Sequence, residues 1–134
     1  MLKIEFFMAM VPPTVTHQEK SVKVVHGKPV FYEPEKLADA RAKLKAHLFA
    51  HRPEKPLTGP VLLKVVWKFP AVGKHRDGDW RDTRPDTDNL QKLLKDVMTD
   101  VGFWKDDAQV CAETVGKIWA DRPGIYILAE ELQP

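Results

Sequence analysis

The sequence predicts an α+β fold, in which a small mixed or antiparallel sheet is covered on one face by two main helices. Short runs rich in β-branched and aromatic residues occur near both ends and in the middle of the chain, which is typical of strands. Two longer stretches carry apolar residues at helical spacing. A chain of 134 residues suits one hydrophobic core. We therefore expect a single domain that spans residues 1–134.

The overall charge says little about the partner, but its distribution is uneven. The chain has 21 Lys and Arg against 19 Asp and Glu, a net charge of +2. Basic residues outnumber acidic ones by 10 to 6 in residues 1–60, whereas acidic residues lead by 13 to 11 in residues 61–134. A bound cation would offset the acidic half and leave the basic half for phosphates. A nearly neutral protein can equally be an enzyme for a small anionic substrate.

The cysteine content and the apolar segments indicate the compartment. Cys111 is the single cysteine, which excludes an internal disulfide framework and fits a reducing cytosol. No segment approaches about 18 continuous apolar residues, and no signal peptide precedes the first predicted strand. We expect a soluble cytoplasmic protein with no membrane partner.

The first strand and the first helix are each bounded by prolines. Residues 2–11 alternate and then become wholly apolar, and the strand ends at Pro12 and Pro13, which cannot donate to a sheet ladder. Pro34 suits a first helical position, and apolar residues recur at helical spacing from there until the chain reaches Pro53. The sequence therefore predicts a strand over residues 2–11 and a helix that ends before Pro53.

Between these two elements, residues 22–32 predict a hairpin or long arm that turns at His26 and Gly27. Lys20, Lys23 and Lys28 are its exposed cations. They could follow a phosphate backbone, or they could only keep an edge strand soluble. Both interpretations of the arm stay open.

Residues 61–69 are β-branched and aromatic and lie between breakers, so we expect a central strand there. A polar loop, residues 71–83, follows directly before the main acidic motif. It carries four candidate DNA contacts: Lys74, Arg76, Trp80 and Arg81. The cations would meet phosphates, and Trp80 could stack on a base or fold back onto the core.

The second main helix begins directly after a pair of acids. Pro85 disfavours helix at the residue before it, and residues 90–101 then carry an apolar stripe at helical spacing. Gly102 follows where the stripe stops, the position expected of a helix C-cap. Asp86 and Asp88 therefore lie at the entrance from a loop into a helix.

The acids predict a metal site. At about 100° per residue, Asp88 and Lys92 project within roughly 40° of each other, opposite the apolar stripe. Beyond Gly102 the chain turns back toward Asp106 and Asp107, so we expect a third carboxylate to approach the first two. Several ionised carboxylates together usually hold a hard cation such as Mg²⁺, and the lysine suggests a phosphate. Alternatively, each acid only caps a helix, or Asp88 and Lys92 form an ordinary surface pair.

Two further runs, residues 110–120 and residues 125–129, predict the last strands. Residues 121–124 supply the turn between them. We expect the two strands to pair as a tight antiparallel hairpin, with the acidic turn at its entrance.

The two acidic segments together resemble the motifs of the RusA family of Holliday junction resolvases, which are encoded mainly by phages and prophages. The resemblance rests on Arg84-Pro85-Asp86-x-Asp88-Asn89-Leu90-x-Lys92, on Trp104-Lys105-Asp106-Asp107-x-Gln109-Val110, and on Lys117. These motifs occupy residues 84–117, and the flanking strands fit less distinctively. The resemblance implies that Asp86, Asp88 and Asp107 bind Mg²⁺, for which Mn²⁺ can substitute. It also implies that Lys92 contacts the scissile phosphate and that Asp106 is an accessory acid.

The resemblance further implies a crossover junction endodeoxyribonuclease that hydrolyses four-way DNA symmetrically in recombination and repair, within a bacterial cell. Arg84 joins the candidate DNA contacts. Two symmetric cuts call for two equivalent sites, which a homodimer supplies. Candidate exposed interface residues are Phe6, Phe7, Val30 and Phe31. One alternative is an idle DNA-binding or regulatory module, which the intact set of the three acids and Lys92 argues against. The other is a metal-dependent phosphatase for small substrates, although the basic arm and the Trp80 loop favour a polymeric substrate.

Overall fold

The structure, a computed structural model, describes residues 2–16, 21–32 and 35–133. Its elements, in chain order, are β1 (Lys3–Met8), β2 (Ser21–Val25), β3 (Lys28–Tyr32), α1 (Glu35–His51), β4 (Val61–Pro70), α2 (Thr87–Val101), the 3-10 turn η2 (Asp107–Gln109), β5 (Val110–Ala120) and β6 (Gly124–Glu131). The α+β class is confirmed, and every predicted strand and helix is present within a few residues of its expected ends.

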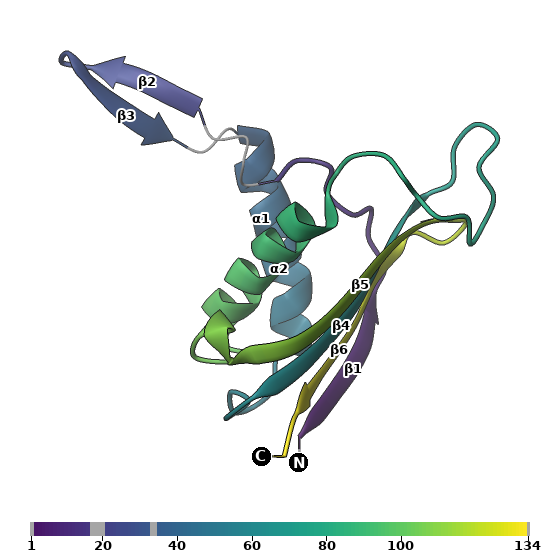
Figure 1. The fold of residues 1–134 in the computed structure, drawn as a ribbon. Helices are drawn as coiled ribbons and strands as arrows, with labels where there is room; N and C mark the ends of the chain where they lie inside the picture. The colour runs from purple at the N-terminus through teal and green to yellow at the C-terminus, as the bar shows by residue number, and fades with distance from the viewer. Residues whose placement is uncertain (1, 17–20, 33–34, 134) are drawn as a thin grey trace.

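The main sheet is mixed and has the strand order β1-β6-β4-β5. Strand β4 pairs antiparallel with β6 and parallel with β5. Figure 1 shows α1 and α2 together on one face of this sheet, as predicted. The expected hairpin between β5 and β6 is wrong, because β4 lies between them. Five of the ten residues of β4 are buried, which suits an inner strand, whereas the first half of β5 is largely exposed and suits an edge.

The core lies between β4 and the apolar stripe of α2. Five alternate side chains of β4 are at most 1% exposed: Val61, Leu63, Val65, Trp67 and Phe69. The buried apolar residues of α2 are Leu90, Leu93, Leu94, Val97, Met98 and Val101. Gly102 ends the helix in the left-handed conformation, with φ 95°, as the C-cap interpretation predicted. No helix in the described part of the chain has the length and apolar character needed to span a membrane.

A buried polar link fixes α2 on the sheet. The Trp67 indole Nε1 donates to Gln91 Oε1 at 2.8 Å, and Gln91 Nε2 donates to Glu113 Oε2 at 2.7 Å. Lys95 Nζ then lies 3.1 Å from the other oxygen of Glu113. Gln91 is only 4% exposed, so both ends of its amide need these partners. The link therefore connects the buried side of α2 to the central strand and to the edge strand β5.

Strands β2 and β3 pair only with each other in the described structure and form a separate two-stranded sheet. Figure 1 shows this hairpin projecting from the rest of the molecule. Lys28 is exposed at the start of β3, whereas Lys20 and the side chain of Lys23 lie outside the described residues. An isolated hairpin is marginally stable in water, so this arm gains stability from any partner that it contacts.

The interface residues predicted on β1 are less exposed than expected. Phe6 and Phe7 are half-buried. The Phe6 ring stacks on His51, with 4.4 Å between the ring centroids. The expectation that both phenylalanines are exposed is wrong, because the end of α1 lies close to β1. The side chains of Val30 and Phe31 lie outside the described residues.

We predict that Gly124→Ala destabilises the fold. A Cβ atom at Gly124 would collide with the Phe7 ring and lie 2.6 Å from the Met8 carbonyl oxygen, which is backbone and cannot move alone. The free energy of unfolding should fall by about 1–3 kcal/mol, the usual cost of overpacking. Chemical denaturation followed by circular dichroism measures this change.

Gly116→Ala is the matched control, because its Cβ would meet only the Trp80 ring at 3.6 Å, an ordinary contact. It should be neutral or slightly stabilising. Equal losses in the two variants would contradict the steric explanation.

Candidate active site

Asp86 and Asp88 lie at the start of α2, as predicted. Asp86 is the N-cap residue, with φ −74° and ψ 146°, and its carbonyl oxygen accepts from the Leu90 N–H at 3.1 Å. Its side chain makes no capping hydrogen bond. Asp88 follows in the first turn, and both acids are exposed. The simple capping alternative is therefore wrong for Asp86, and the helix dipole favours negative charge at both positions.

Two basic side chains hold the loop that carries these acids. Lys117 Nζ donates to the carbonyl oxygens of Thr83 and Pro85, both at 2.7 Å. Between them, the Arg84 carbonyl accepts from Arg81 Nη2 at 2.5 Å. Three consecutive carbonyl groups before Asp86 are thus held by charge-assisted hydrogen bonds, which are stronger than neutral ones.

Arg81 is itself held in place by the sheet. Its guanidinium carbon lies 4.3 Å from the centroid of the Phe69 ring and 4.5 Å from that of Trp119. Its Nε also donates to Thr83 Oγ1 at 3.2 Å. Burial lowers the pKa of Arg81. Arg81, which the sequence suggested as a DNA contact, therefore uses its guanidinium for contacts within the chain, whereas the side chain of Arg84 is exposed.

Lys117 is the functional candidate for which the sequence indicated no role, although it belongs to the motif. Burial lowers the pKa of Lys117 and so does Arg81, whereas Asp86 and Asp82 act in the opposite direction. The side chain therefore lies within electrostatic reach of a predicted metal acid. Only the fold reveals this, because β5 brings Lys117 beside a loop that is more than 30 residues away in the chain.

Lys92 lies on the exposed side of α2 and pairs with Asp96, one turn further on, at 3.5 Å. Its side chain is 53% exposed. A surface pair of this spacing contributes only about 0.3–0.5 kcal/mol. Lys92 can therefore leave Asp96 for a phosphate at little cost.

Asp107 does not join the other two acids within one chain, so the expected approach is wrong. Asp86 precedes α2 and Asp107 follows it, and a helix of 15 residues is about 22 Å long. After Gly102 the chain enters η2 and β5 at the far end of the helix, as Figure 1 shows. Among the described residues, no group of three His, Cys, Asp or Glu side chains is placed to hold a metal ion.

The two acids of the turn after α2, Asp106 and Asp107, differ in what their side chains contact. Asp106 Oδ1 accepts from the Ala108 N–H at 2.8 Å, and Gln109 Oε1 accepts from the Asp106 N–H at 3.2 Å, which completes a capping box. Asp107 is half-buried and faces a polar hollow of about 380 Å³. The hollow is lined by Arg41, Asp96, Thr99, Asp100, Lys105, Asp106 and Asp107. Asp106 therefore has a structural role, and Asp107 remains the available acid.

The donors in one chain fit an open Mg²⁺ site. Asp86 and Asp88 offer hard carboxylate oxygens two residues apart at an exposed helix start. Mg²⁺ is commonly bound by one or two carboxylates, with water and substrate phosphates completing its shell. The two acids therefore suit an ion that is shared with a phosphate ligand.

The loop of residues 71–83 lies along the second half of β5. The Gly78 N–H donates to the Trp119 carbonyl at 2.8 Å, and Trp80 forms a backbone bridge with Ile118. Trp80 remains 77% exposed, so its folding back into the core is wrong. Lys74 and Arg76 are exposed as well. The loop thus presents cations and an aromatic ring from a backbone that is hydrogen-bonded to β5.

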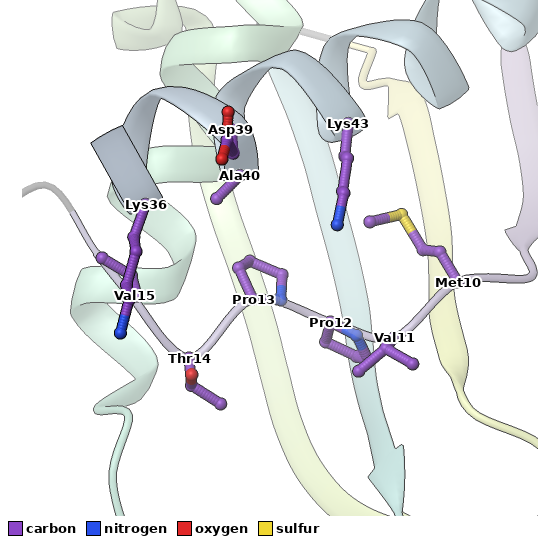
Figure 2. A pocket seen from close by; sticks show the side chains of 10 residues that line it. All are labelled: Met10, Val11, Pro12, Pro13, Thr14, Val15, Lys36, Asp39, Ala40 and Lys43. Atoms are coloured by element: carbon purple, nitrogen blue, oxygen red, sulfur yellow. The ribbon is translucent and has the colours of Figure 1, made fainter. Parts of the chain in front are cut away.

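A separate groove of about 340 Å³ lies between the segment after β1 and α1. Figure 2 shows Lys36 and Lys43 extending from the helix over the prolines of that segment. None of the predicted site residues lines it. The candidate site is thus marked by exposed carboxylates rather than by this groove.

Comparison with known proteins agrees with these features. The chain matches the family Endodeoxyribonuclease RusA over residues 11–130. It is 33% identical over 111 residues to the crossover junction endodeoxyribonuclease rusA of Lactococcus phage r1t, covering 81% of this chain and 83% of that protein. It is 32% identical over 93 residues to the uncharacterized protein YqaN of Bacillus subtilis (strain 168), covering 61% and 65%. The predicted resemblance is confirmed: the chain belongs to the RusA family of endodeoxyribonucleases.

Proposed function

We propose that this protein is a Mg²⁺-dependent, structure-selective endonuclease that resolves four-way DNA junctions by symmetric hydrolysis of phosphodiester bonds. One observation supports this most directly. Asp86 and Asp88 are exposed and the Asp86 carboxylate makes no cap, in a chain that belongs to an endodeoxyribonuclease family. A pair of free carboxylates at a rigid helix start suits a metal ion that must also bind a phosphate.

The proposed chemistry is direct hydrolysis. Asp86 and Asp88 would hold Mg²⁺, or Mn²⁺ in its place, and the bound ion would polarise the phosphate and lower the pKa of an attacking water. Lys92 would leave its surface pair with Asp96 and face the negative charge that develops on the phosphate.

The exposed basic and aromatic side chains would position the DNA. We assign this role to Lys28, Lys74, Arg76, Trp80 and Arg84, all of which are exposed. The cations would contact phosphates and Trp80 would stack on an unpaired base near the branch point. We assign the same role to Lys20 and Lys23, which belong to the arm that carries Lys28.

We further propose that the active particle is a homodimer. A four-way junction has two-fold symmetry, so two equivalent sites can cut it in symmetric positions. The dimer also offers a place for Asp107, which follows α2 whereas Asp86 precedes it in the same chain. A second copy can bring its Asp107 to the Asp86 and Asp88 of the first, and the reverse.

The decisive experiment compares three labelled substrates: a four-way junction, a linear duplex and a generic phosphomonoester, each with Mg²⁺, with Mn²⁺ or with EDTA. We expect cleavage of the junction alone, dependent on the metal. Binding to the junction without cleavage would indicate an idle module. Turnover of the phosphomonoester would indicate a phosphatase.

We predict that Asp88→Asn preserves folding and junction binding but lowers the Mg²⁺-dependent cleavage rate by more than about a hundredfold, the scale on which a preorganised electrostatic group acts. The change is nearly isosteric and lies off the buried stripe. Single-turnover cleavage and a thermal unfolding scan measure the two effects. Asp39→Asn, the same change on the exposed surface of α1, should cleave normally. Normal turnover in Asp88→Asn would remove this acid from the metal site.

We predict that Lys92→Ala lowers turnover far more than junction affinity. One cation in a large phosphate interface contributes modestly to binding, but it contributes much more if it faces transition-state charge. Lys92→Arg should restore only part of the rate, because the planar guanidinium is bulkier. Titration of junction binding and single-turnover rates separate the two quantities. Equal losses in both would mark Lys92 as a general backbone contact.

We predict that Asp88→Asn and Asp107→Asn complement each other. If each site combines acids from two chains, a mixed dimer holds one intact site and one doubly defective site. The inactive variants should then regain nicking of one strand when they are mixed, without full resolution. Light scattering should report about twice the chain mass of 15.3 kDa. Mixtures as inactive as the separate variants would place all three acids of a site in one chain.

A further inference from the structure

The loop before the candidate metal acids has an unusual arrangement of hydrogen-bond acceptors. The carbonyl groups of three successive residues, Thr83, Arg84 and Pro85, all accept from Lys117 or Arg81. Loop carbonyls on a surface are ordinarily satisfied by water. Here Lys117, from strand β5, and Arg81, from the same loop, donate these hydrogen bonds instead, directly before Asp86.

Both donors are placed by the sheet before they reach the loop. Lys117 extends from β5, in register with Trp67 of the central strand. Arg81 lies against the rings of Phe69 and Trp119, and its N–H donates to the Lys117 carbonyl at 3.0 Å. Both donor side chains of this clamp are thus anchored on the second half of β5 and on the neighbouring strand β4.

The clamp reaches Asp86 through the backbone. Holding the Pro85 carbonyl orients the following peptide unit, and the Asp86 carbonyl then accepts the first hydrogen bond of α2. The Asp86 carboxylate stays uncapped, although N-cap aspartates often bond to nearby amide groups. Asp86 and Asp82 also act to raise the pKa of Lys117, against the larger lowering by burial and by Arg81.

We propose that Lys117 and Arg81 are positioning residues of the active site: they clamp the carbonyl groups of residues 83–85 and so hold the Asp86 carboxylate free for the metal ion. The proposal rests on the proposed function, because it concerns the same site. A purely structural clamp would stabilise the fold without changing how the protein binds a metal. A positioning clamp changes metal binding itself, since misplaced ligands coordinate less well.

The test is Lys117→Met, which removes the ammonium and keeps an unbranched side chain. Its control is Lys64→Met, the same change at an exposed position of β4. Two quantities are measured at a temperature where both variants are folded. They are the affinity for Mn²⁺ without DNA, from electron paramagnetic resonance, and the Mg²⁺ concentration that gives half-maximal junction cleavage.

We expect Lys117→Met to weaken Mn²⁺ binding, to raise the half-maximal Mg²⁺ concentration and to lower the single-turnover rate at least tenfold. Junction affinity in EDTA should stay within about threefold, because Lys117 uses its donors inside the chain. Lys64→Met should match the wild type in all these measurements. A folded Lys117→Met protein with wild-type metal dependence would overturn the proposal.

If Lys117→Met does not fold, Arg81→Lys decides the question, with Arg122→Lys on the exposed turn as its control. The first change keeps the charge but loses the forked contacts to Thr83 and Arg84, so the metal dependence should shift in that variant alone. An unchanged dependence would again overturn the proposal. If the wild type does not cleave junctions, the proposed function falls, and the Mn²⁺ titrations still decide the positioning role.

Discussion

Burial of the apolar stripe of α2 against β4 is the constraint on which the candidate site depends. The stripe leaves the helix one orientation on the sheet, and the buried amide of Gln91 adds a directional link to Trp67 and Glu113. A helix seated in this way has two fixed ends. Asp86 lies at one end and Asp107 lies just beyond the other, so the rigidity that orders each acid also keeps them apart within one chain.

The same sheet controls the loop that precedes the helix. The second half of β5 supplies Lys117, pairs with the segment around Trp80, and contributes Trp119 to the support of Arg81. Edge strands usually leave backbone groups open to other chains. Here part of that edge is covered by the protein's own loop, which becomes a rigid base for Asp86 and leaves Trp80 exposed beside it.

The basic side chains near the candidate site fall into two groups, those bonded within the chain and those exposed to solvent. Arg81 and Lys117 donate hydrogen bonds to the backbone of the loop before Asp86. The side chains of Lys74, Arg76 and Arg84 are exposed. A net charge near zero is therefore compatible with a phosphate-binding enzyme, because the balance is local. The projecting hairpin of β2 and β3 carries the exposed Lys28 away from this acidic region.

The sequence by itself determined the secondary-structure elements and the family. Helical spacing and Gly102 defined α2, β-branched runs defined the strands, and the motif from Arg84 to Lys117 indicated the family. Such signals are local, and local preferences are what one sequence displays. Only the tertiary structure decided that β4 separates β5 from β6, that Asp86 and Asp107 lie beyond opposite ends of α2, and that Lys117 holds the loop. These depend on which buried surfaces pack together, and packing between distant segments leaves no periodic trace in the chain.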